Sequence, residues 1–176
     1  MIFRLLGERG VSVFNDQLET LYIKYHRELY LYAFSLCKDY HLAQDLTSET
    51  FFKAILSLDD NVTYIKYWLF RVCKNLFIDY ARKDKEYSNT EGLEDALTSA
   101  ITPLDRLIES EDKKHLYNQV INLHQTYSEI LILYYYCDFT LNEICKTTGM
   151  TTGSAKTLLF RARKKLKIKL EGKNEI

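Results

Sequence analysis

The chain has 176 residues, of which 47% are hydrophobic, and its 24 basic and 24 acidic side chains cancel at pH 7. This composition predicts one ordinary folded domain or two small ones, and it excludes a disordered chain. The longest apolar run, residues 130–137, is far shorter than the ~20 residues that a membrane-spanning helix needs. Arg4, Gly7 and Glu8 interrupt the apolar amino terminus, so we expect no signal peptide and a cytoplasmic protein.

The charge is unevenly distributed along the chain, although it sums to zero. Residues 84–112 hold nine acidic side chains against two basic ones, a balance of −7, whereas residues 156–173 hold eight basic ones against one acidic, a balance of +7. We expect these two segments to attract each other until a partner separates them. Because residues 156–170 contain no acid, they are typical of a surface that binds a polyanion.

The first predicted helix covers residues 15–38, where apolar side chains recur at three- and four-residue steps. Asn15 or Asp16 is its expected N-cap, and residues 1–14 are then an N-terminal arm. Its many tyrosines are expected in the core, with hydroxyls that reach water.

Two more helices are predicted before the middle of the chain, the second over residues 42–58 after Asp39 and the third over residues 63–83. The polar first half of the second helix forms an acidic ridge, which by itself indicates only a solvated surface. The third helix has a predicted buried stripe made of Leu69, Val72, Cys73, Leu76 and Tyr80. Its other face mixes cations, an amide and aromatics, as a grip on phosphates and unpaired bases requires: Tyr67, Arg71, Lys74, Asn75, Ile78 and Arg82.

Residues 84–104 have the composition of a flexible acidic linker. They show no steady period, they carry much of the acid, and they contain Gly92 and the only proline of the chain, Pro103. We therefore predict an all-α protein of two small helical domains, residues 15–83 and residues 105–176.

The second domain is predicted to begin with helices in residues 105–123 and residues 127–137. Residues 129–137, EILILYYYC, have the composition of a buried strand, but the neighbouring segments offer no strand to pair with. A helix is therefore favoured.

Residues 139–170 read as a short helix, a turn at Gly149 and a longer basic helix that Thr152 can cap, which is a helix-turn-helix pattern. On a helical wheel the docking face of the longer helix holds Ala155, Leu158, Leu159, Ala162 and Leu166. The opposite face holds Lys156, Thr157, Phe160, Arg161, Lys164 and Lys167. A solvated lysine face would explain the cations alone, but the turn glycine and the preceding helix favour DNA binding.

No pattern of catalytic or metal-binding residues stands out. The cysteines show no paired spacing and are expected to be buried free thiols: Cys37, Cys73, Cys137 and Cys145. The histidines are also scattered, without ligand spacing: His26, His41, His115 and His124. We therefore expect no enzyme activity, no metal and no other cofactor.

Four blocks of the sequence, in order, resemble an RNA polymerase sigma factor of the extracytoplasmic-function type with regions two and four only. The blocks are LYIKYHRELYLYA, AQDLTSETF, YWLFRVCKNLFIDYARK and EILILYYYCDFTLNEICKTTGMTTGSAKTLLFRARKKL. The resemblance covers nearly all of the chain from residue 18 onward. It departs from the family pattern where Ser48 replaces a glutamine, Leu158 an arginine and His124 a proline.

The resemblance implies a site in each part of the chain. Residues 15–83 would bind the polymerase clamp and melt the minus-ten element, and residues 105–176 would read the minus-35 element. The implied polymerase contacts are Asp45, Leu46, Ser48, Glu49 and Phe52. The implied minus-ten contacts are Asp60, Asn61, Thr63, Trp68, Arg71, Lys74, Asn75 and Arg82. The implied minus-35 contacts are Thr152, Ser154, Lys156, Thr157, Phe160, Arg161 and Lys164.

The implied partners are core RNA polymerase, promoter DNA and an anti-sigma factor, with no small-molecule substrate. Two other interpretations remain open. A stand-alone regulator would bind DNA as a helix-turn-helix dimer, with the tyrosine-rich front helices as its interface. A helical interaction module would bind no DNA, and its lysines would be solvated.

Overall fold

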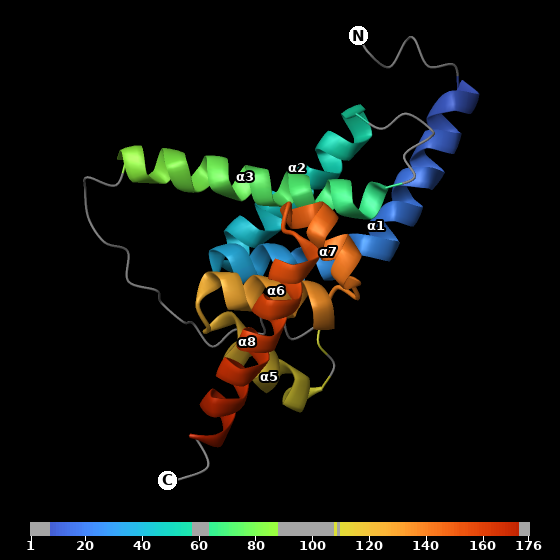
Figure 1. The fold of residues 1–176 in the computed structure, drawn as a ribbon. Coiled ribbons are helices and arrows are strands. Elements are labelled where there is room, and N and C mark those ends of the chain that lie inside the picture. The colour runs from blue at the N-terminus through green and yellow to red at the C-terminus, as the bar shows by residue number, and fades with distance from the viewer. Residues whose placement is uncertain (1–7, 58–63, 88–107, 109, 173–176) are drawn as a thin grey trace.

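The computed structural model describes residues 8–57, 64–87, 108 and 110–172, and within these ranges the chain is helical and has no strand (Figure 1). The all-α prediction is therefore confirmed, and residues 129–135 are helix, not strand. The helices are α1 (Glu8–Cys37), α2 (Tyr40–Ser57), α3 (Ile65–Tyr87), α5 (Glu111–Ile121), α6 (Gln125–Tyr135), α7 (Leu141–Thr148) and α8 (Thr152–Glu171). None of them is both long enough and apolar enough to cross a membrane.

Two helix ends differ from the sequence prediction. The helix α1 begins at Glu8 and runs straight through Asn15 and Asp16, so the N-cap placed there was wrong. Both residue types cost only a fraction of a kcal/mol inside a helix, which is too little to end one. The helix α3 continues at its carboxyl end to Tyr87, so the linker predicted at residues 84–104 starts too early. Most of that segment lies outside the described residues.

The helices α1, α2 and α3 contact one another and form the N-terminal unit. The turn between α1 and α2 is closed by Asp39, whose Oδ1 accepts a 2.7 Å hydrogen bond from the Leu42 backbone N–H. Rings join the two helices on both sides of this turn, since Phe34 stacks on Tyr40 at 4.6 Å and Tyr22 lies 5.0 Å from Phe51. The unit is thus held by aromatic packing at helical spacing, as its sequence indicates.

The helices α5 to α8 form the C-terminal unit, and this unit packs directly on the first one. The helix α6 lies along α1, and α7 lies against α3 in the middle of the molecule (Figure 1). Every side chain of residues 29–36 in α1 is buried, and so is every side chain of residues 128–133 in α6. A helix without an exposed face is covered on all sides, and here each unit covers the remaining face of the other.

Two tyrosines of the core show how closely the units fit. The Tyr32 hydroxyl donates to Glu129 Oε1 at 2.7 Å, and the Tyr117 hydroxyl donates to the Leu31 carbonyl at 2.6 Å. The expectation that the tyrosine hydroxyls of the first helix reach water was therefore wrong for Tyr32. Burial, together with the Glu129 charge, holds the pKa of Tyr32 well above its usual range, so the hydroxyl stays a donor.

The buried face of α3 is shifted relative to the predicted stripe. Leu69 and Cys73 are buried as predicted, but Tyr80 is 47% exposed. Phe70, which the wheel left outside the stripe, is fully buried because Phe139 of the C-terminal unit covers it at 4.8 Å. The helix therefore buries one face in its own unit and a second face against the other unit.

The four cysteines are free thiols, with Cys73 and Cys137 buried and Cys37 and Cys145 partly buried. Burial raises the pKa of Cys37 to about 11 and that of Cys73 to about 12. Thiols of this kind are weak nucleophiles at neutral pH, which agrees with a packing role.

Candidate nucleic-acid interface

The helix-turn-helix is fixed by local hydrogen bonds at both ends of its turn. At the start of α7, Thr140 and Glu143 form a reciprocal capping box, in which the Thr140 N–H donates to Glu143 Oε2 at 2.6 Å. At the start of α8 the N-cap is Thr151, whose Oγ1 accepts from the Ser154 N–H at 3.2 Å. The cap predicted at Thr152 was thus one residue late, since Thr152 is the first residue of the helix.

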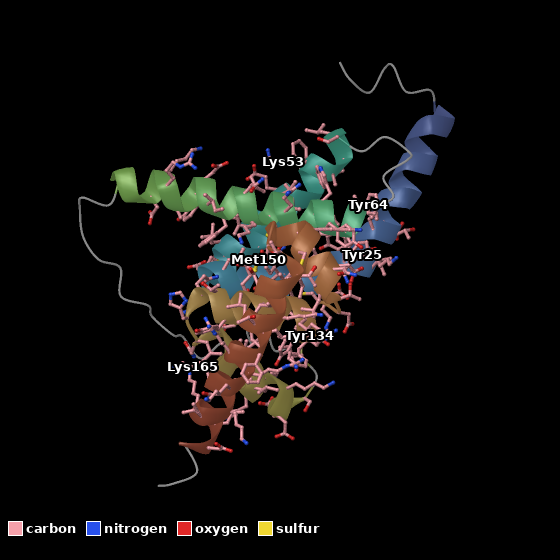
Figure 2. All side chains as sticks on the ribbon, in the orientation of Figure 1. Tyr25, Lys53, Tyr64, Tyr134, Met150 and Lys165 are labelled. Atoms are coloured by element: carbon pink, nitrogen blue, oxygen red, sulfur yellow. The ribbon has the colours of Figure 1, made fainter. Side chains whose placement is uncertain are left out.

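The turn itself depends on Gly149, which ends α7 in the left-handed conformation at φ 78°. Met150, labelled in Figure 2, follows it in the turn. An L-residue with a side chain pays roughly 1–2 kcal/mol for this conformation, and glycine does not.

We expect Gly149→Ala to lower the free energy of unfolding by about 1–2 kcal/mol, through backbone strain alone, because no atom lies within 4 Å of the added Cβ. Gly153→Ala, which also meets no atom but lies in helical backbone, should instead raise it by about 0.5 kcal/mol. Urea denaturation of both variants measures the difference. Equal effects of the two substitutions would contradict a strained turn.

The two faces of α8 divide as the wheel predicts. Ala155, Leu159 and Ala162 are buried against the unit, and Leu158 and Leu166 are partly buried. Phe160 is 69% exposed although it is a large aromatic. The other candidate minus-35 contacts are also exposed: Thr152, Ser154, Lys156, Thr157, Arg161 and Lys164. Their side chains therefore form one solvent-facing surface, as a recognition helix requires.

This surface includes a hollow of about 490 Å³ at the amino-terminal end of α8. Ser154, Thr157 and Arg161 line it from α8, and Thr126 lines it from α6. A guanidinium beside two hydroxyls can donate to base edges and to phosphate oxygens, so the hollow supplies both kinds of contact.

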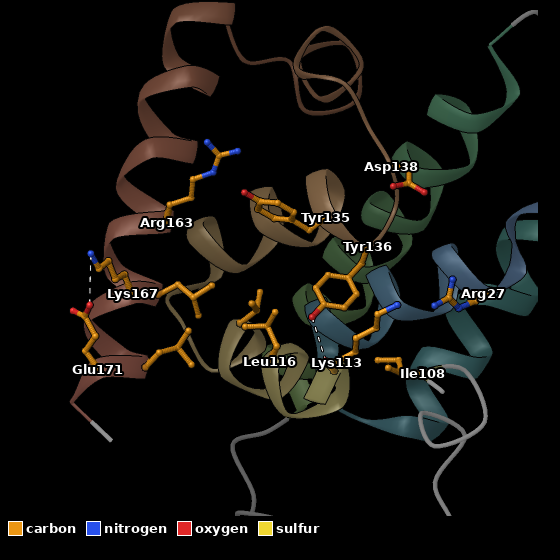
Figure 3. Close-up of a pocket in the computed structure, with 13 residues that line it drawn as sticks. Arg27, Ile108, Lys113, Leu116, Tyr135, Tyr136, Asp138, Arg163, Lys167 and Glu171 are labelled. Carbon is orange, nitrogen blue, oxygen red and sulfur yellow. Dashed lines mark hydrogen bonds and ion pairs between the residues drawn. The ribbon is translucent and has the colours of Figure 1, made fainter. Parts of the chain in front are cut away.

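A second hollow, of about 710 Å³, lies between α5, α6 and α8 on the C-terminal unit (Figure 3). Its floor is apolar, with Leu116 labelled at the centre of the view, and Arg163 and Lys167 reach it from α8. Lys167 Nζ pairs there with Glu171 Oε1 at 3.6 Å. Lys167 lies two turns after Phe160 on the exposed face of α8, as predicted, and its side chain, which is 74% exposed, also borders this groove.

The candidate minus-ten residues on α3 divide into two groups. Arg71, Asn75 and Arg82 are exposed, and Arg82 pairs with Asp79 at 3.6 Å. Lys74 and Trp68 are partly buried, and Lys74 is covered by Glu129 of the C-terminal unit. The remaining three lie outside the described residues: Asp60, Asn61 and Thr63.

Trp68 and Arg71 line a hollow of about 380 Å³ together with Tyr67, and with two residues that the sequence did not single out for binding, Tyr64 and Lys146. Tyr64, at the start of α3 (Figure 2), lies beside Tyr67 with ring centroids 5.8 Å apart. Lys146 of α7 lies 5.1 Å from the Tyr64 ring. Three aromatics beside cations suit base stacking, but one of the cations belongs to the other unit.

The candidate polymerase contacts on α2 are exposed with one exception. Asp45, Ser48, Glu49 and Phe52 face solvent, whereas Leu46 is only 4% exposed and packs in the core. In this arrangement Leu46 supports the helix and cannot be part of its surface. Leu56, which the sequence did not single out, is also exposed, one turn beyond Phe52.

His124 and Leu158, where the chain departs from the family pattern, both have structural roles. His124 is the N-cap of α6, and its Nδ1 accepts from the Thr126 N–H at 3.4 Å. Leu158 lies partly buried between the surface of α8 and the unit, beside Thr126 and Tyr127.

Comparison with known proteins agrees with this geometry. Residues 21–87 match the family model of Sigma-70 region 2, and residues 116–166 match that of Sigma-70, region 4. The chain is 33% identical over 154 residues to the ECF RNA polymerase sigma factor SigM of Bacillus subtilis, covering 85% of this chain and 93% of that one. It is 31% identical over 156 residues to the RNA polymerase sigma factor SigV of the same organism, covering 87% and 90%.

Two solved structures share the fold. The sigma factor RpoE of Bartonella quintana, in complex with the anti-sigma factor NepR, has a TM-score of 0.63 at 22% identity and covers 88% of this chain and 97% of that one. CnrH in complex with the cytosolic domain of CnrY has a TM-score of 0.63 at 20% identity and covers 96% and 97%.

The paired region 2 and region 4 units, with an exposed recognition helix in the second, define an RNA polymerase sigma factor, which directs promoter-specific initiation of transcription. The sequence identity to relatives of nearly the same length shows to which family of sigma factors the chain belongs. The chain belongs to the extracytoplasmic-function (ECF) family of sigma factors.

Proposed function

We propose that residues 15–83 bind core polymerase and melt the minus-ten element, and that residues 105–176 read the minus-35 element. The observation that supports this division is the exposed surface of α8, where Phe160 stands among cations at the outer face of a helix-turn-helix. An aromatic on that face gains stability only against a partner, such as a thymine methyl or a sugar.

Each unit then has a different task. In the C-terminal unit, Thr157, Phe160 and Arg161 read bases, and Lys164 contacts phosphates. In the N-terminal unit, Trp68, Arg71 and Asn75 hold the unpaired strand. The loop of residues 60–63, outside the described residues, receives a base taken out of the stack. Asp45, Glu49 and Phe52 contact the polymerase clamp.

In this proposal the chain performs no catalysis and needs no cofactor. It works in the cytoplasm beside the polymerase, and an anti-sigma factor holds it inactive, as the two complexes of similar fold suggest. Its contribution is delivery, because it positions the polymerase over two promoter elements and traps unpaired bases.

Run-off transcription with core polymerase, with and without this protein, tests the proposal. We expect promoter-specific transcripts only when the protein is present, and we expect Asp45→Ala combined with Glu49→Ala to abolish them. A dimer in gel filtration that binds a two-fold site without polymerase would instead identify a stand-alone regulator.

A further inference from the structure

The contact between the two units is centred on one buried carboxylate. Glu129 of α6 is a buried acid whose side chain is 9% exposed, and its Oε1 accepts two hydrogen bonds of 2.7 Å, from the Tyr32 hydroxyl and from Lys74 Nζ. Both donors belong to the N-terminal unit. A buried carboxylate needs such partners, so the contact is stable only while the units are together.

A second group of contacts lies beside it, between α3 and the segment that begins with Cys137. Lys66 Nζ donates to the Cys137 carbonyl at 2.6 Å and lies 4.5 Å from the centroid of Phe139. The Tyr67 hydroxyl donates to Glu143 Oε1 at 2.9 Å. Hydrogen bonds from Thr140 and Tyr67 outweigh the effect of burial and lower the pKa of Glu143, so this acceptor is charged at neutral pH.

These contacts reach one of the candidate minus-ten residues of α3, Lys74, whereas Arg71, Asn75 and Arg82 stay exposed. Lys74 is bound to a carboxylate, and Trp68 lines a hollow that Lys146 of α7 also lines. A carboxylate oxygen at 2.7 Å from an ammonium group occupies the position that a phosphate oxygen would take. Bound DNA and the C-terminal unit would therefore compete for Lys74.

We propose that the C-terminal unit is a built-in competitor for the strand-binding face of α3, with Glu129 in the place of a DNA phosphate. Lys74 is available to unpaired DNA only after the two units separate. That Glu129 holds the two units together follows from the contacts alone. That the C-terminal unit competes with DNA rests also on the proposed function.

The test compares full-length wild type with Glu129→Gln, which keeps the shape and removes the charge, and with Glu111→Gln. The control makes the same charge change at an exposed acid of α5, which pairs at 2.7 Å with Lys114 on its own helix. Trp68 is the only tryptophan of the chain, so its emission reports opening of the α3 face. Hydrogen exchange over residues 136–139 reports it independently.

For Glu129→Gln we expect a red shift of Trp68 emission and about tenfold faster exchange over residues 136–139, with no change for Glu111→Gln. Affinity for a labelled single-stranded DNA of random sequence should rise at least about fivefold, because a phosphate contact is independent of sequence. Adding Lys74→Ala should remove this gain.

Unchanged hydrogen exchange and Trp68 emission in Glu129→Gln would show that Glu129 does not hold the units together. Separation of the units without a gain in DNA affinity would show that the C-terminal unit does not compete with DNA. If Glu129→Gln does not fold, Tyr67→Phe takes its place in the test. This variant removes only the hydrogen bond to Glu143, and it should show the same changes to a smaller extent. Failure of run-off transcription with the wild type and with every variant whose units separate would refute the proposed function. It would not affect the inference that Glu129 holds the two units together.

Discussion

Replacing Phe70 by alanine is expected to lower the free energy of unfolding by about 3–5 kcal/mol, the largest stability effect of any single change considered for this protein. Phe70 is fully buried, and its ring centroid lies 5.1 Å from that of Tyr32 and 4.8 Å from that of Phe139. Tyr32 belongs to the N-terminal unit and Phe139 to the C-terminal unit, so the cavity would open where the two units meet.

Urea denaturation measures this loss, and Ile78→Ala on the same helix provides the control. Ile78 is half-exposed, so its truncation should cost less than about 1 kcal/mol. Because both units share one continuous core, Phe70→Ala should shift a single cooperative transition. A cost for Phe70→Ala as small as that for Ile78→Ala would show that the ring is solvated and that the units are apart in solution.

The helices and the recognition surface could be predicted from the sequence because both depend on local information. The faces of α8 follow from its period, and the turn follows from Gly149, whose positive φ few other residues tolerate. Local rules fail where two residues compete for one role, as Thr151 and Thr152 do for the cap of α8. Leu46 was misplaced for a related reason, since it stands among polar neighbours and only the fold shows which way it points.

The packing of one unit on the other could not be predicted in the same way. A helical wheel assigns one buried face to each helix, but Phe70 lies on a second face that only the other unit covers. The available signal was that residues 29–36 and residues 130–133 are apolar on all sides, apart from Ser35. Such runs indicate a helix with two partners, although they do not identify the second partner.

The expected attraction between residues 84–112 and residues 156–173 illustrates the same limit. Most of the acidic segment lies outside the described residues. Among the described residues, the ion pair that joins the units has the opposite arrangement, with the cation Lys74 in the N-terminal unit and the acid Glu129 in the C-terminal one. Net charge over a segment predicts long-range attraction, whereas a buried pair depends on single positions.

Replacing Arg161 by alanine should reduce discrimination between the matched minus-35 sequence and a scrambled one by about 1–3 kcal/mol, which is roughly fivefold to 150-fold in relative affinity. Arg161 is exposed on α8 and lines the hollow that also holds Thr157, so its guanidinium can reach base edges. The measurement is binding of the holoenzyme, assembled from core polymerase and each variant, to the two duplexes at several salt concentrations.

Lys164→Ala is the matched control, because it removes one exposed cation from the same helix without removing a fork of donors. It should weaken binding to both duplexes equally and lower the slope of log K against log salt by about 0.9, the effect of one phosphate contact. Equal losses on matched and scrambled DNA for Arg161→Ala as well would make Arg161 a second phosphate contact. The reading of the minus-35 element would then have to rest on Thr157 and Phe160, whose truncation can be measured on the same pair of duplexes.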